Sequence, residues 1–135
     1  MPKIIIAGSR SMTNYSQMQQ TWADYIQKYN LAISQITIIS GGANGADKLA
    51  EQLAKENGIR LEVMKADWQV HGNSAGHIRN NAMAKAAGTD GRLLAFWDGE
   101  SRGTEGMIKQ ARNAGLHVEI VRVSEEAEIV EQLTL

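Results

Sequence analysis

Short apolar runs alternate with helical patterns along the whole chain, and this alternation constrains the fold more than any other feature. The first run, residues 3–7, is β-branched and uninterrupted, as a strand buried on both faces reads. Further strands are predicted at residues 36–40, 61–64, 92–97 and 118–123. Helices are predicted at residues 15–29, 46–56, 77–87 and 104–114, followed by a short acidic helix at the C-terminus.

Strands that alternate with helices are joined by right-handed crossovers, which place the strands in parallel and the helices on both faces. We therefore expect an α/β fold, with a parallel five-stranded sheet in a single Rossmann-like domain. The length of 135 residues fits one domain, so residues 1–135 are assigned to it, and 43% apolar residues suffice for a core.

Composition excludes several classes of protein. The chain has no cysteine, which excludes thiol catalysis, cysteine zinc sites and disulfides and agrees with a reducing compartment. His71, His77 and His117 lack partners at ligand spacing, so we expect neither a metal nor a cofactor. No apolar run approaches the ~18 residues of a membrane helix. These features predict a soluble, cytoplasmic protein with no membrane partner.

The balance of charge bears on the partner. The chain has 14 basic and 15 acidic residues, a formal net charge of −1. Proteins that bind DNA or RNA usually carry a basic stripe, so this balance argues against nucleic acid as the partner.

Three glycine-rich loops follow predicted strands: Gly8-Ser9-Arg10, the loop from Gly41 to Gly45, and residues 98–104. In a sheet of this kind, ligands lie beyond the carboxyl ends of the strands. Glycine lets backbone N–H groups approach a ligand, and the next helix supplies unpaired donors that suit phosphate. A tight turn also explains any one glycine loop, but three at one sheet edge favour a ligand site. No loop matches the Walker or dinucleotide fingerprint.

Charged residues beside these loops have two interpretations each. Arg10 and Arg79 suit phosphate through their planar guanidinium groups, although Arg79 also fits a solvated helix face. Asp47 either serves the ligand or caps its helix, and Asp98 either contacts a ribose hydroxyl or orders its loop.

Two tryptophans are candidates for stacking on a base. Trp68 lies in a polar stretch, residues 67–76, where packing alone explains an indole poorly. Trp97 ends an apolar strand and fits the core equally well.

In five successive stretches the chain resembles the SLOG superfamily, specifically its YspA/YpsA-like branch. They include Gly8-Ser9-Arg10, Gly41-Gly42-Ala43-Asn44-Gly45-Ala46-Asp47, Ala66-Asp67-Trp68, Gly76-His77-Ile78-Arg79-Asn80-Asn81-Ala82-Met83, and Trp97-Asp98-Gly99 with Ser101-Arg102-Gly103-Thr104. The resemblance implies a Rossmann-like fold and a pocket for a nucleotide or nucleotide-derived signal, lined by Gly41, Gly42, Arg79, Gly103 and Thr104. It also implies a homo-oligomer, although the sequence leaves the oligomeric state open.

Two groups of relatives in the superfamily imply alternatives. Lonely Guy phosphoribohydrolases cleave the base from a ribose phosphate with an arginine and a glutamate two residues after a Gly-Thr pair. That position is Gly106 here, and Glu105 precedes it by one residue, a turn of about 100° on a helix. Relatives of DNA-processing protein A carry a Ser-Gly-Gly-Ala-type loop and bind single-stranded DNA, usually with a basic surface.

The leading prediction is a protein that binds a nucleotide-like small molecule, to sense or sequester it. The alternatives are a phosphoribohydrolase, with Arg79 and Glu105 as catalytic residues, and a single-stranded DNA binder. Whether the protein is an enzyme stays open. The predicted ligand-binding residues are Gly8, Ser9, Arg10, Ser40, Gly41, Gly42, Ala43, Asp47, Trp68, Arg79, Asn80, Trp97, Asp98, Ser101, Gly103 and Thr104.

Overall fold

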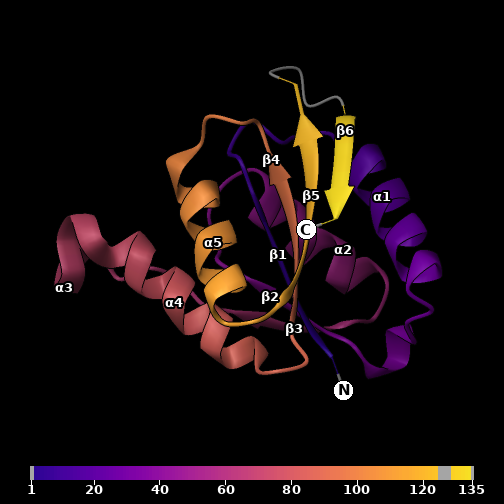
Figure 1. Cartoon of the computed structure of the whole chain (residues 1–135), viewed down its shortest axis with the longest axis horizontal. Coiled ribbons are helices and arrows are strands. Elements are labelled where there is room, and N and C mark those ends of the chain that lie inside the picture. Colours follow the sequence, from indigo (N-terminus) through magenta and orange to yellow (C-terminus); the bar gives the residue numbers. More distant parts are fainter. Residues whose placement is uncertain (1, 125–128, 135) are drawn as a thin grey trace.

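The computed structural model describes residues 2–124 and 129–134, and its strands form one sheet with helices on both faces (Figure 1). The strands are β1 (Lys3–Gly8), β2 (Thr37–Ser40), β3 (Arg60–Val63), β4 (Arg92–Trp97), β5 (His117–Val123) and β6 (Ile129–Thr134). The α-helices are α1 (Tyr15–Lys28), α2 (Ala46–Glu56), α3 (Trp68–His71), α4 (Ala75–Ala87) and α5 (Arg102–Asn113), with 3₁₀ turns η1 (Ile33–Gln35) and η2 (Gly72–Ser74). None of these helices is long and apolar enough to cross a membrane.

The strand order explains where a ligand site can form. The sheet runs β3-β2-β1-β4-β5-β6, and β1 to β5 are parallel. The chain moves outward from β1 to β3 and then returns to the other side of β1 with β4. The strand order therefore reverses between β1 and β4. The predicted Rossmann-like α/β fold is confirmed.

Alternate residues of β1 point into two separate cores. Ile4 and Ile6 pack with α1 and α2, whereas Ile5 and Ala7 pack with α4 and α5. Figure 1 shows these helix pairs on the two sides of the sheet. All four side chains are buried, which explains why the sequence of β1 reads as a continuous apolar run.

The predicted acidic C-terminal helix is wrong, and the sheet has a sixth strand instead. Residues 129–134 form β6, which pairs antiparallel with β5. Glutamate has a good helix propensity, so an acid-rich tail favoured helix. Pairing with β5 instead satisfies backbone groups that an unpaired edge would expose. Glu131 lies in β6, whereas Glu125, Glu126 and Glu128 lie outside the described residues.

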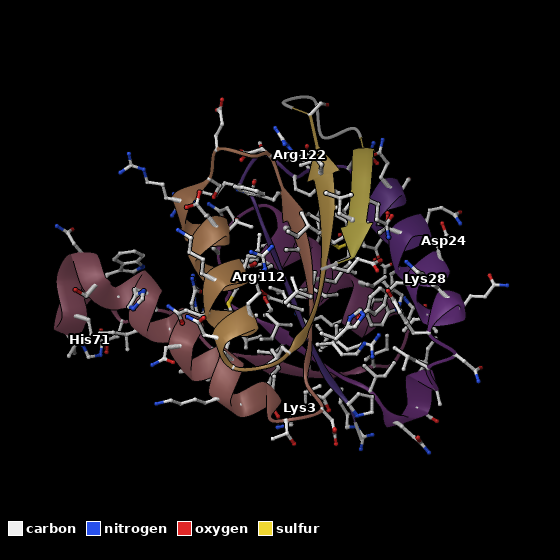
Figure 2. The ribbon with its side chains drawn as sticks, viewed as in Figure 1. Lys3, Asp24, Lys28, His71, Arg112 and Arg122 are labelled. Carbon is white, nitrogen blue, oxygen red and sulfur yellow. The ribbon has the colours of Figure 1, made fainter. Side chains whose placement is uncertain are left out.

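The helix boundaries differ from the prediction at three places near the site, one of them the start of α5, which lies at Arg102 rather than at residue 104. The stretch predicted as irregular, residues 67–76, contains α3, whose first turn is capped by the Asp67 carboxylate accepting the Val70 N–H at 3.1 Å. α4 begins at Ala75, two residues earlier than expected. As a result, α3 and the start of α4 project beyond the sheet, and Figure 2 shows His71 at the tip of this segment.

Candidate functional site

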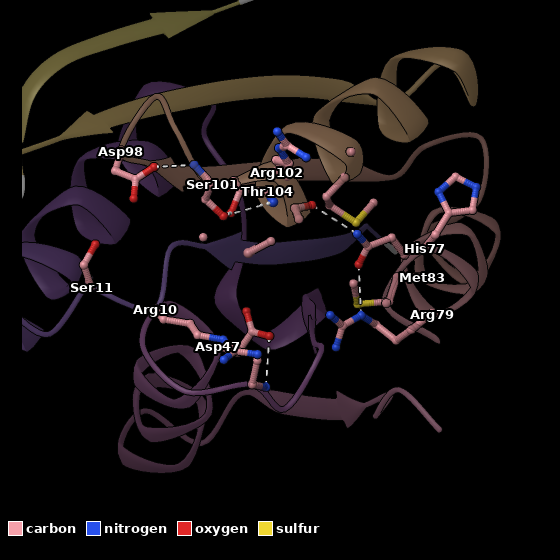
Figure 3. A pocket seen from close by; sticks show the side chains of 18 of the residues that line it. Arg10, Ser11, Asp47, His77, Arg79, Met83, Asp98, Ser101, Arg102 and Thr104 are labelled. Carbon is pink, nitrogen blue, oxygen red and sulfur yellow. Dashed lines mark hydrogen bonds between the residues drawn. The ribbon is translucent and has the colours of Figure 1, made fainter. Parts of the chain in front are cut away.

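A cavity of about 620 Å³ lies at the carboxyl ends of β1 and β4, where the strand order reverses. Open α/β sheets bind ligands at such switch points. Its size is in the range of ligand pockets. Figure 3 shows Arg10, Asp47 and Arg79 on one side of this cavity and Ser101, Arg102 and Thr104 on the other. Its walls come from the loops after β1, β2 and β4, from α2, α3 and α4, and from the first turns of α5.

Ser9 joins the three glycine-rich loops. Its N–H donates to the Phe96 carbonyl at 2.9 Å, and its carbonyl accepts the Ala46 N–H at 3.3 Å. Its hydroxyl accepts the Asp98 N–H at 3.1 Å. Ser9 is buried and does not line the cavity. This residue therefore holds the walls of the cavity together rather than facing it.

In the loop from Gly41 to Gly45, two backbone amides donate to side chains of the protein itself. The Gly42 N–H donates to the Ser40 hydroxyl at 3.2 Å, and the Ala43 N–H donates to Asp47 Oδ2 at 3.1 Å. Neither Gly41 nor Gly42 lines the cavity. A Cβ on Gly41 would lie 2.8 Å from both Arg79 Cζ and Asp47 Oδ2. The absence of a side chain at Gly41 is thus what lets these two charged groups approach.

Asp47 is a buried carboxyl that lines the cavity. Its side chain is 5% exposed. Burial raises its pKa from 3.8 to about 6, although the Ala43 N–H and the Arg79 guanidinium both act in the opposite direction. Asp47 therefore titrates close to neutral pH, unlike an exposed aspartate.

Arg79 is held in place by uncharged acceptors. Its Nη1 donates to the Gly41 carbonyl at 2.5 Å, and its Nε donates to the Asn80 side-chain oxygen at 2.9 Å. Burial lowers its pKa, and the nearby Asp47 carboxylate partly offsets that effect. Among the described residues no ion pair joins Arg79 to a carboxylate. A half-buried cation without a paired anion is an electrostatic reason for an anionic ligand.

The first turn of α5 forms the opposite wall. Ser101 caps it by accepting the Thr104 N–H at 3.4 Å, and its hydroxyl also lies 3.2 Å from that of Thr104. In the described part of the chain, the N–H groups of Arg102 and Gly103 have no acceptor. Because such amides and the helix dipole attract anions, this wall complements Arg79 across the cavity.

Two comparisons with known proteins place this chain in a family. The model of the YspA, cpYpsA-related SLOG family matches residues 2–71. This chain belongs to that SLOG family. It is also similar to the Gene 61 protein of Mycobacterium phage D29, with 33% identity over 123 residues that cover 87% of this chain and 94% of that protein. The resemblance drawn from the sequence motifs is confirmed.

Most of the predicted residues of this SLOG protein gather around the cavity. The structure brings eleven of the sixteen predicted ligand-binding residues into its lining. They are Gly8, Arg10, Ala43, Asp47, Trp68, Arg79, Asn80, Asp98, Ser101, Gly103 and Thr104. The other five, Ser9, Ser40, Gly41, Gly42 and Trp97, lie outside that lining.

Two of the predicted residues support the loop that follows β4. The Trp97 Nε1 donates to the Ser101 carbonyl at 3.0 Å. Asp98 Oδ1 accepts the N–H groups of Glu100 and Ser101 at 2.8 and 2.7 Å. Burial opposes ionisation of Asp98, but these hydrogen bonds outweigh it and lower its pKa. Both residues therefore order the loop, and Asp98 also faces the cavity.

Trp68 and Glu105 differ in how they lie relative to the cavity. Trp68, at the start of α3, is 55% exposed and lines the rim. Glu105 does not line the cavity; its carboxylate pairs with Lys109 at 3.0 Å, one turn along α5. The neighbouring residue, Gly106, lines the cavity instead of Glu105. The phosphoribohydrolase alternative thus has no Glu105 carboxylate at the cavity.

Sequence reasoning missed nine lining residues: Ala7, Ser11, Asn73, Gly76, His77, Met83, Arg102, Gly106 and Met107. Arg102 carried a usable signal, because it stands between Ser101 and Gly103 in a predicted loop. The apolar ones gave none, since a methionine in a helix also reads as core. Within the described residues, no three His, Asp or Glu side chains are grouped closely enough to hold a metal ion.

Proposed function

We propose that this SLOG protein binds a nucleotide or nucleotide-derived molecule through its phosphate. The observation that carries the proposal is Arg79, a half-buried guanidinium without an ion-pair partner in the described chain, facing the unpaired amides of α5 across a cavity at the switch point. Family membership supports a nucleotide-related ligand.

The phosphate is best accommodated between Arg79 and the first turn of α5. There it meets the amides of Arg102 and Gly103, and Arg10 and Arg102 supply further positive charge. The loop from Gly41 to Gly45 is less suitable, because two of its amides already donate to Ser40 and Asp47. Trp68 at the rim offers an exposed indole for stacking on a base.

Capture fits the geometry better than cleavage. Base removal by the phosphoribohydrolase route needs a carboxylate where Gly106 stands, and Glu105 is paired with Lys109 instead. Incubation with nucleoside 5′-monophosphates, followed by chromatography for free base, tests for turnover. Release of base at a rate that falls in Glu105→Gln would contradict this choice.

The binding test is a thermal shift and calorimetric titration against AMP, GMP, CMP, UMP, ADP-ribose and cyclic dinucleotides. A compound present at a hundred times its Kd adds about 2.7 kcal/mol to the free energy of unfolding. We expect at least one to stabilise the wild type, and Arg79→Gln to weaken its binding by about tenfold or more.

The matched control is Arg112→Gln, which removes the same charge from an exposed position in the last turn of α5 (labelled in Figure 2). It should bind like the wild type. A panel without any stabilising compound, or equal losses in both arginine variants, would overturn the proposal.

A further inference from the structure

Asp47 offers the cavity a second recognition group, opposite in character to Arg79. Its Oδ2 accepts the Ala43 N–H, while Oδ1 has no hydrogen-bond partner among the described residues. Oδ1 is also absent from the polar atoms that are sealed from solvent without a partner. Because Asp47 lines the cavity, this oxygen is an acceptor open to a ligand there.

The carboxylate of Asp47 and the guanidinium of Arg79 lie close together beside Gly41. Oδ2 of Asp47 and Cζ of Arg79 each lie 2.8 Å from where a Gly41 Cβ would stand, yet the two groups form no ion pair in the described chain. The Nη2 of Arg79 likewise has neither a partner nor a place among the sealed atoms. A ligand in the cavity that reaches both side chains therefore meets an acceptor and a donor from neighbouring groups.

Arg79 and Asp47 bind different kinds of ligand atom. An ionised carboxylate only accepts hydrogen bonds, and it repels a phosphate oxygen placed against it. A phosphate oxygen therefore belongs on Arg79, and the atom beside it that faces Asp47 must carry a hydrogen. In a nucleotide the hydroxyls of the sugar are the donors nearest the phosphate, whereas the base lies across the sugar ring.

We propose that Asp47 selects ligands whose phosphate has a sugar hydroxyl beside it, so that the pocket takes ribose phosphates in preference to deoxygenated sugars or free phosphate. This inference rests on the proposed function. Asp98 is the other acid in the lining, but its Oδ1 already accepts two loop amides. It also lies at the far end of the cavity from Arg79 (Figure 3).

The test compares AMP, GMP, CMP and UMP with their 2′,3′-dideoxy counterparts, and adds ribose 5-phosphate and inorganic phosphate. A hydrogen bond to a charged group is worth enough to change affinity by about tenfold or more. We expect the wild type to bind its preferred ribonucleotide at least tenfold more tightly than the dideoxy form. In Asp47→Asn this preference should fall to within about twofold.

Asp47→Asn is a suitable variant because an asparagine oxygen still accepts the Ala43 N–H, so the loop keeps its anchor. The matched control is Glu51→Gln. Glu51 is a buried acid on α2 that bonds the Ser40 hydroxyl at 3.0 Å and does not line the cavity. It should keep the wild-type preference for the ribonucleotide, and circular dichroism verifies that both variants fold.

The outcomes separate this inference from the proposed function. Equal affinity of the wild type for ribo and dideoxy forms, with nucleotide binding intact, overturns the role of Asp47 alone. So does a preference that survives in Asp47→Asn but disappears in Asp98→Asn. A preference for one base that Asp47→Asn abolishes, with ribose 5-phosphate unaffected, assigns Asp47 to the base instead of the sugar. Failure of every nucleotide to bind removes the proposed function and this inference with it.

Discussion

The side-chain oxygen of Asn80 accepts a hydrogen bond from the Nε of Arg79, its neighbour on α4, at 2.9 Å. The amide nitrogen of the same side chain donates to the Gly103 carbonyl on α5 at 3.2 Å. Asn80 is buried and touches both walls of the cavity. This one amide therefore fixes the direction of the guanidinium and links the two helices that enclose the proposed phosphate site.

Asn80→Ala should destabilise the protein and weaken ligand binding together. Removal of the amide takes the acceptor from the Nε of Arg79 and the side-chain donor from the Gly103 carbonyl, at a cost of about 1–3 kcal/mol in the free energy of unfolding. Urea denaturation measures that loss. An unchanged unfolding midpoint would show that water replaces the amide at no cost.

Asn80→Asp tests how the charge and hydrogen bonding of residue 80 affect ligand binding. Aspartate keeps an acceptor for Arg79 but cannot donate to the Gly103 carbonyl when ionised, and it adds a negative charge beside the proposed phosphate site. We expect nucleotide affinity to fall by at least tenfold, and to recover in part as the carboxyl is protonated at low pH. Titration calorimetry at two pH values measures both effects.

Arg79→Lys should behave like a loss of the residue rather than a conservative change. Arg79 contacts Asn80 through Nε and Gly41 through Nη1 while its Nη2 stays free. The ammonium group of lysine is a single point of charge and cannot reproduce this fork. We expect AMP-class ligands to bind about tenfold or more weakly at constant net charge. Wild-type affinity in Arg79→Lys would mean that charge alone is recognised.

The position of the cavity could be predicted from the sequence, because it depends on chain order. The pattern of apolar strand, glycine-rich loop and helix that begins at residues 3–7 recurs along the chain. This repetition predicts parallel strands and a switch point in the sheet. The role of Gly41 and Gly42 could not be predicted from the sequence. A loop that needs glycine to admit Arg79 has the same sequence as a loop that needs glycine to admit phosphate, and only the placement of Arg79 distinguishes them.

Two further features depended on contacts that sequence patterns do not contain. Asp47 does not cap α2, which has no side-chain cap hydrogen bond; its Oδ2 instead accepts the Ala43 amide of the preceding loop, and this leaves Oδ1 free. The strand at residues 129–134 depends on the open edge of β5, whereas its glutamates favoured helix. Both are tertiary effects that override a local preference.

Gly106→Ala should stabilise the empty protein and weaken its ligand binding. Gly106 lies within α5, a Cβ there meets nothing within 4 Å, and the residue lines the cavity. Replacing a helical glycine with alanine gains about 0.5–1 kcal/mol. The new methyl group also takes space from the ligand. Thermal melts with and without a bound nucleotide measure the two effects, and a gain in both would show that the ligand does not reach this wall.

The pH dependence of stability tests the environment of Asp47. Its pKa is raised from 3.8 to about 6 in the folded state, so the native protein holds a proton that the unfolded chain releases. The favourable contribution is complete below pH 3.8 and is lost as pH rises through about 6. This difference in pKa between the folded and unfolded states corresponds to at most about 3 kcal/mol in the free energy of unfolding.

Asp47→Asn removes this titration and should therefore be more stable than the wild type at pH 8, while the two converge toward pH 4. The charged neighbours, Arg79, Glu51 and Lys48, are unchanged in the variant and serve as a common background. Urea denaturation from pH 4 to pH 8 gives the difference in free energy of unfolding at each pH. If that difference stays constant across the range, Asp47 is ionised throughout. In that case the favourable contacts of its carboxylate with Arg79 and the Ala43 amide outweigh the effect of burial, and the pKa is not raised.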